Sequence, residues 1–121
     1  MSAKFYAADL GIGMDLAERV SRFMVLAKDM SPRPWVKNGM VRVYFEPWSQ
    51  NRLPVFHLAD KYFYDAVKDD VFATGFFYGC KHEYTLKRLV SLSTSNFSGA
   101  KTKARLVEFS ELFYGKEANR D

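Results

Sequence analysis

The period of the hydrophobic residues changes twice along this chain, and this change constrains the fold more than any other feature. Apolar residues follow the 3.6-residue period of a helix over 14–30, the two-residue period of a strand over 40–45, and the helical period again over 100–115. For a chain of 121 residues, this order predicts a single globular domain, 1–121, of the α+β class. We expect an N-terminal helix, a central and mostly antiparallel sheet, and a C-terminal helix–loop–helix.

The first helical segment, 14–30, is preceded by two glycines and followed by two prolines. Its apolar stripe consists of Leu16, Val20, Phe23, Ala27 and Met30. Pro32 and Pro34 end the helix, because proline disfavours helical backbone in the residue before it. Gly11-Ile12-Gly13 looks like the start of a dinucleotide-binding fingerprint, but Leu16 stands where that fingerprint needs a third glycine or alanine. We therefore interpret these residues as a flexible turn that enters the helix.

A β-hairpin is predicted over residues 35–45. Asn38-Gly39 separates 35–37 from 40–45, and this pair best tolerates the positive φ that both central positions of a tight hairpin turn require. One side of the second strand is expected to carry Val41, Val43 and Phe45, and the other side Arg42 and Tyr44.

Residues 54–78 fit two patterns. Their β-branched and aromatic residues predict strands near 54–58, 61–66 and 71–78. A helix is the alternative for the first part of this segment, with a stripe formed by Val55, Leu58, Ala59, Tyr62 and Ala66.

The last forty residues are predicted to form two helices joined by a loop. Leu86, Leu89 and Val90 have helical spacing, and the polar residues 93–99 predict a turn. A second helix from Ala100 is expected to end at Gly115, in the position that glycine favours after a helix. Over the whole chain, the residues expected to be mostly buried are Val20, Phe23, Ala27, Val41, Val43, Phe45, Leu106, Phe109 and Phe113.

The net charge of +4 is distributed unevenly. Residues 81–105 carry a charge of +5, with Glu83 as their one acid, and the rest of the chain carries −1. A basic stretch with so few acids is what a phosphate-binding surface needs, although an ordinary solvated face has the same composition. The predicted nucleic-acid-binding residues are Lys81, Lys87, Arg88, Ser98, Gly99, Lys101, Lys103 and Arg105.

Residues 98–102 resemble part of a nucleotide phosphate loop, but Ala100 and Ser95 stand where that loop needs glycines, so nucleotide hydrolysis is not predicted. Ser98 is suited to cap a helix that starts near Gly99. Lys101 and Lys103 would then lie at the positive end of the helix dipole, an arrangement that a bound anion stabilises.

Cys80-Lys81-His82 places a thiol close to an imidazole, which makes a cysteine-dependent enzyme a third hypothesis. A free cysteine more often serves as a small buried apolar residue. A zinc site needs three or four ligands, and the chain offers one cysteine and two histidines, His57 and His82. Neither a zinc site nor any other metal or cofactor is therefore predicted. His57 lies in an apolar run and is expected to be half-buried, and Asp69-Asp70 is interpreted as a turn.

Aromatic residues make up 17% of the chain, and sheet aromatics beside basic residues stack unpaired bases in several folds. We predict a small non-enzymatic nucleic-acid-binding accessory domain. The alternative is a protein-interaction module, an inhibitor or adaptor, that docks through exposed Trp35, Trp48 and sheet aromatics.

The single cysteine fits a reducing compartment, so a cytoplasmic location is expected. The longest uncharged apolar run, 71–80, is too short to span a bilayer, and no signal peptide is predicted. The oligomeric state does not follow from these patterns.

Overall fold

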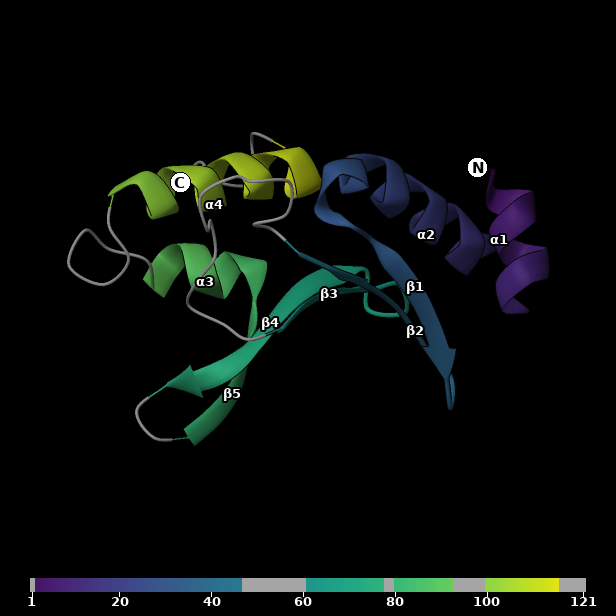
Figure 1. Ribbon diagram of the computed structural model, residues 1–121, viewed down its shortest axis with the longest axis horizontal. Helices are drawn as coiled ribbons and strands as arrows, with labels where there is room; N and C mark the ends of the chain where they lie inside the picture. The colour runs from purple at the N-terminus through teal and green to yellow at the C-terminus, as the bar shows by residue number, and fades with distance from the viewer. Residues whose placement is uncertain (1, 47–60, 78–79, 93–99, 116–121) are drawn as a thin grey trace.

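The computed structural model describes residues 2–46, 61–77, 80–92 and 100–115, and it confirms the α+β class (Figure 1). In chain order the elements are α1 (Ala3–Leu10), α2 (Met14–Leu26), the 3-10 helix η1 (Lys28–Met30), β1 (Arg33–Lys37), β2 (Met40–Phe45), β3 (Lys61–Asp65), β4 (Asp70–Phe77), β5 (Cys80–Thr85), α3 (Leu86–Leu92) and α4 (Ala100–Tyr114).

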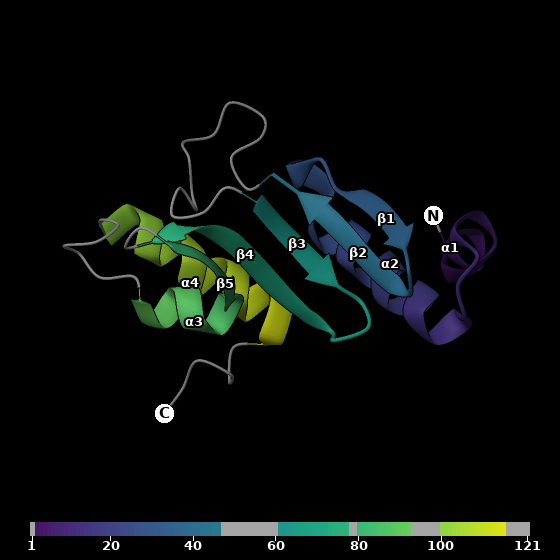
Figure 2. The same ribbon diagram turned by 90° about the horizontal axis from the view of Figure 1, so that it is seen from below.

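The five strands form one antiparallel sheet in the order β1-β2-β3-β4-β5. Helices α2, α3 and α4 lie over one face of this sheet, and α1 packs against α2 at one end of the helical layer (Figure 1). From the opposite side the strands lie in front, and no described helix covers them (Figure 2). The sheet therefore has an inner face toward the helices and an outer face that none of the described helices covers.

The hairpin predicted over 35–45 is present as β1 and β2. Asn38 and Gly39 have φ values of 51° and 78°, so both central positions of the turn adopt the left-handed conformation that the sequence predicted. Lys37 pairs with Met40, which leaves two residues in the turn and fixes the register of the whole hairpin.

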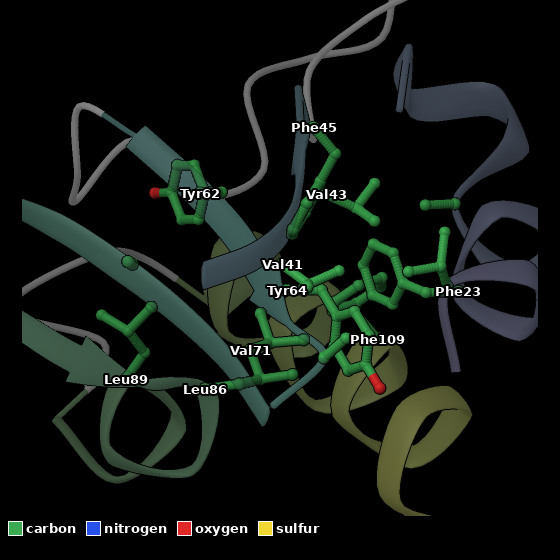
Figure 3. Packing of buried hydrophobic residues seen from close by; sticks show 14 of the residues in the cluster. Phe23, Val41, Val43, Phe45, Tyr62, Tyr64, Val71, Leu86, Leu89 and Phe109 are labelled. Atoms are coloured by element: carbon green, nitrogen blue, oxygen red, sulfur yellow. The ribbon is translucent and has the colours of Figure 1, made fainter. Parts of the chain in front are cut away.

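The core lies between the inner face of the sheet and the helices (Figure 3). The ring of Phe23 on α2 stacks on Tyr64 of β3 with a centroid separation of 4.6 Å. The ring centroids of Phe45 on β2 and Phe109 on α4 are 5.7 Å apart. Each such aromatic pair contributes about 0.5–1.5 kcal/mol beyond the burial of its area. Every residue of the predicted core is buried except Phe113, which is half-buried.

The N-terminal helices differ from the expectation in two ways. Helix α1 was not predicted; Ser2 caps it by accepting a hydrogen bond from the Phe5 amide, and Gly11 ends it with φ 65°. Helix α2 ends at Leu26, not at residue 30, and continues as η1. The Met30 carbonyl accepts a 2.7 Å hydrogen bond from the Glu46 amide, so the chain here is tied to the end of β2.

The later elements confirm most of the remaining expectations. Strands predicted at 61–66 and 71–78 are present as β3 and β4, and the last helix ends before Gly115, which has φ 95°. Strand β5 was not predicted. The strand expected at 54–58 and the proposed cap at Ser98 and Gly99 lie outside the described residues. None of the described helices is long and apolar enough to cross a membrane.

Candidate nucleic-acid interface

The outer face of the sheet carries its own aromatic layer. Strand alternation points Val41 and Val43 toward the helices, and it therefore points the residues between and beside them outward. In the strand register, Trp35 is opposite Arg42, Tyr44 is opposite Phe63, and Phe63 is opposite Phe72. We call Trp35, Tyr44, Phe63 and Phe72 the outer aromatic layer; none of the four belongs to the core cluster.

Arg42 lies at the centre of this layer. Its guanidinium carbon is 4.2 Å from the centroid of the Phe63 ring and 5.9 Å from that of Trp35. Its Nη1 atom donates a 3.2 Å hydrogen bond to the Tyr44 hydroxyl, and its Nε atom lies 3.9 Å from the carboxylate of the buried Asp65. These contacts fix the guanidinium against aromatic faces, where a cation is attracted by the ring quadrupole.

The four rings differ in how much surface they offer. The rings of Phe63 and Phe72 stack with a centroid separation of 5.6 Å, and the two residues are only 3% and 9% exposed. The Lys68 ammonium lies 5.1 Å from the Phe72 ring centroid. Trp35 and Tyr44 are half-buried, and their rings meet edge to face with a centroid separation of 6.0 Å. Accessible ring surface on this face therefore comes from Trp35 and Tyr44, and the two phenylalanines support them.

Besides Arg42, the outer face carries three described lysines, and the register also places the acid Glu83 there. The register places Lys37, Lys61 and Lys81 on the outer face, where their side chains are exposed and form no ion pair with any described residue. Arg33 pairs with Glu46 at 4.0 Å, and both side chains are well exposed. An exposed pair of this kind contributes little to stability and is easily exchanged for another partner.

The residues predicted from the basic stretch fall in several places. Lys81 lies on the outer face, whereas Lys87 and Arg88 are exposed on α3 in the helical layer. The backbones of Lys101, Lys103 and Arg105 lie in the first half of α4, and their side chains lie outside the described part of the chain, as do Ser98 and Gly99 entirely. Lys81 is thus separated from the helical cations by the sheet.

Helices α3 and α4 lie side by side and antiparallel (Figure 1). At one end of the pair, the Lys87 ammonium is 5.1 Å from the ring centroid of Tyr114. Lys101 precedes Tyr114 by thirteen residues, which is roughly 20 Å at the rise of a helix. The cations of the helix pair therefore span its length and do not form one cluster.

The remaining candidates fall on β5 and on the turn after β3. Strand alternation puts Lys81 on the opposite face from His82, whose ring stacks on Tyr84 with a centroid separation of 5.6 Å. The side chain of Cys80 and all of His57 and Trp48 lie outside the described residues. Of the predicted turn at Asp69-Asp70, Asp69 is the last turn residue after β3, and Asp70 begins β4. No group of three or more potential metal ligands is found in the described chain.

Sequence reasoning placed Arg42 and Tyr44 on the polar side of β2 but did not connect them to a site. The connection needs the β2–β3 and β3–β4 registers, which bring Phe63 and Phe72 beside them. The alternation within 61–65 gave the only available signal, because it places Phe63 on the opposite face from Tyr62 and Tyr64.

Comparison of this chain with protein-family models, with curated proteins and with solved structures finds no match. The assignment of a function therefore rests on the geometry of these surfaces alone.

Proposed function

We propose that this protein is a non-enzymatic accessory domain that binds single-stranded nucleic acid on the outer face of its sheet. The observation that carries the proposal is the outer aromatic layer, in which Arg42 is held against the rings on the face that no described helix covers. Exposed sheet aromatics beside cations are the feature that stacks unpaired bases in several unrelated folds.

In this proposal, Trp35 and Tyr44 receive the bases. Their rings are partly accessible, and Arg42 is already oriented by Tyr44 and Asp65, so little side-chain entropy is lost when a base stacks beside them. Stacking of a base on an aromatic side chain contributes about 1–3 kcal/mol and tolerates any sequence. We therefore expect weak discrimination between base types.

Phosphates of the same strand would contact Lys37, Lys61 and Lys81 around the layer. Because acids share this face, the electrostatic contribution is moderate, and stacking supplies most of the affinity. The stretch 84–107 has no acid in its sequence, and its described parts belong to α3 and α4 apart from the end of β5. Both helices lie on the other side of the sheet, so their cations and those of the outer face can be tested separately. A cytoplasmic location, expected from the single cysteine, belongs to the same proposal.

The test is a titration of fluorescein-labelled oligothymidylate, oligouridylate and duplex DNA of about 15 nucleotides, at about 50 and 200 mM salt. Wild-type protein is expected to bind the single strands more tightly than the duplex. Trp35→Ala should weaken single-strand binding about tenfold or more, and Trp35→Phe should restore most of it because phenylalanine keeps a ring for stacking.

Phe5→Ala is the matched control, because Phe5 is 41% exposed on α1, away from the sheet. If Trp35→Ala and Phe5→Ala lose the same amount of single-strand affinity, the outer face is not the interface. If wild-type protein binds none of the oligonucleotides at the lower salt concentration, the proposal fails. The protein-interaction alternative then takes its place, and its apolar contacts predict binding that is insensitive to salt.

A further inference from the structure

A cleft of about 450 Å³ lies on the helical side of the molecule, away from the outer aromatic layer. Its walls come from α2, from the turn between β3 and β4, and from the last turn of α4. The apolar part is formed by Leu26, Phe113 and the 64%-exposed Leu112, above a floor of Phe23 and Tyr64. This size and lining suit a small molecule that carries an apolar group.

Opposite charges line the same cleft without meeting. Arg19 and Arg22 are three residues apart on one side of α2, and Asp69 lies in the β3–β4 turn. Among the described residues, neither arginine forms an ion pair with Asp69. Arg19 donates a 2.8 Å hydrogen bond to the Ala66 carbonyl instead, which holds its guanidinium at the turn. Separate positive and negative groups in one cleft leave space for a ligand that bridges them.

Asp69 is held in place as an acceptor. The Tyr64 hydroxyl donates a 2.6 Å hydrogen bond to its Oδ1 atom, which leaves Oδ2 for another donor. Burial raises the pKa of Tyr64, and the bond to Asp69 raises it further, so the phenol stays protonated and continues to donate at neutral pH.

The ends of two helices add negative potential beside Asp69. The cleft is lined by Leu26, the last residue of α2, and by Tyr114, the last residue of α4, so the C-terminal ends of both helices meet there (Figure 1). The carbonyl groups at a helix C-terminus carry a partial negative charge and favour a cation. An anion fits at the arginine side of the cleft, and a cation fits at the side of Asp69.

We propose that this cleft binds a free α-amino acid with an apolar side chain. The carboxylate of the ligand is received by Arg19 and Arg22, the ammonium group by Asp69 and the nearby helix carbonyls, and the side chain by Leu26, Leu112 and Phe113. A guanidinium is suited to a carboxylate because it presents paired N–H donors in one plane. The site is independent of the proposed nucleic-acid surface, so either proposal can fail alone.

The experiment follows backbone amide NMR shifts while one of three probes is added: L-phenylalanine, 3-phenylpropionate, which lacks the ammonium group, or 2-phenylethylamine, which lacks the carboxylate. We expect L-phenylalanine to bind at least about tenfold more tightly than either analogue, because each lost charged hydrogen bond costs a factor of this order. The shifts should be largest at residues 19–26, 66–69 and 112–114.

Two variants assign the charges. Arg22→Gln should weaken binding of L-phenylalanine and 3-phenylpropionate about tenfold and leave 2-phenylethylamine unchanged. Asp69→Asn should weaken L-phenylalanine and 2-phenylethylamine and leave 3-phenylpropionate unchanged or tighter. Both positions are exposed, and asparagine tolerates the positive φ of 54° at residue 69, so both variants are expected to fold.

Lys28→Gln is the control, because it removes an exposed positive charge from η1, outside the cleft lining. The proposal is overturned if the shifts do not saturate, if they map away from the cleft, or if the three probes bind alike. It is also overturned if Lys28→Gln and Arg22→Gln have the same effect, because binding would then depend on overall charge.

Discussion

The Tyr64 hydroxyl donates a 2.6 Å hydrogen bond to Asp69 and so joins the inner face of β3 to the turn that follows it. A second phenol acts similarly from the helical layer, because Tyr114 on α4 donates a hydrogen bond to Asp70 at the start of β4. Both tyrosines line the cleft. The β3–β4 turn is therefore held by one phenol from the sheet and one from a helix.

These two bonds predict a loss of stability in alkaline solution. Burial is the main cause that raises the pKa of Tyr64 and of Tyr114 above the ordinary tyrosine value. The hydrogen bonds to Asp69 and Asp70 raise these pKa values further. The folded protein then keeps protons that the unfolded chain releases, so the free energy of unfolding falls as pH rises above about 10 and is unaffected below it. Urea unfolding at neutral pH and above pH 10 should show this decrease.

The double variant Tyr64→Phe/Tyr114→Phe should lose less stability than wild type over the same alkaline range. Tyr44→Phe removes a phenol that is bonded to Arg42 and not to a carboxylate, so it serves as the control. Parallel pH profiles for wild type and the double variant would contradict the role given to the two phenols.

Replacement of Phe109 tests the packing of α4 on the sheet. Phe109 is 3% exposed and lies 5.7 Å from Phe45, so Phe109→Ala should reduce the free energy of unfolding by about 3–5 kcal/mol. Leu112→Ala, at a 64%-exposed position of the same helix, should change it by less than about 0.5 kcal/mol. Similar losses in the two variants, measured by urea unfolding, would show that α4 does not pack as described.

The β1–β2 turn gives a second stability prediction. Gly39 has φ 78°, and a side chain there costs about 1–2 kcal/mol, so Gly39→Ala should lower the free energy of unfolding by that amount. Asn38→Gly keeps the left-handed backbone accessible and should change stability by less than about 0.5 kcal/mol. Thermal or urea unfolding checks both, and a neutral Gly39→Ala would mean that the turn relaxes into another conformation.

The elements that local chemistry dictates were predictable from the sequence. Asn38-Gly39 determines a two-residue hairpin turn by itself, and the apolar stripes around Phe23 and Phe109 give the helices that cover the sheet. Helix α1 has no comparable stripe, and it depends on a cap at Ser2 and on packing against α2. The chain after α2 forms η1, and at its end the Met30 carbonyl accepts a hydrogen bond from the Glu46 amide, a contact sixteen residues apart that no local pattern encodes.

The candidate site was less predictable because it depends on strand register. The sequence shows Arg42 and Tyr44 on one side of a strand, but their position over Phe63 follows from pairing between β2 and β3. The charge of +5 over 81–105 is continuous in the sequence, but the structure divides it between elements. Lys81 lies on the outer face of β5, whereas Lys87 lies on α3. A run of like charge therefore predicts a surface only where one element carries it.

Two triple variants decide which basic surface contacts phosphate. Lys37→Gln/Lys61→Gln/Lys81→Gln removes three cations from the outer face, and Lys101→Gln/Lys103→Gln/Arg105→Gln removes the same charge from α4. Each lost phosphate contact should lower the slope of log affinity against log salt by about one unit and weaken all sequences equally. For single strands, we expect the outer-face variant to lower this slope and the α4 variant to leave it unchanged. The reverse result would keep nucleic-acid binding but move the interface to the α3–α4 pair, as the charge pattern of the sequence first predicted.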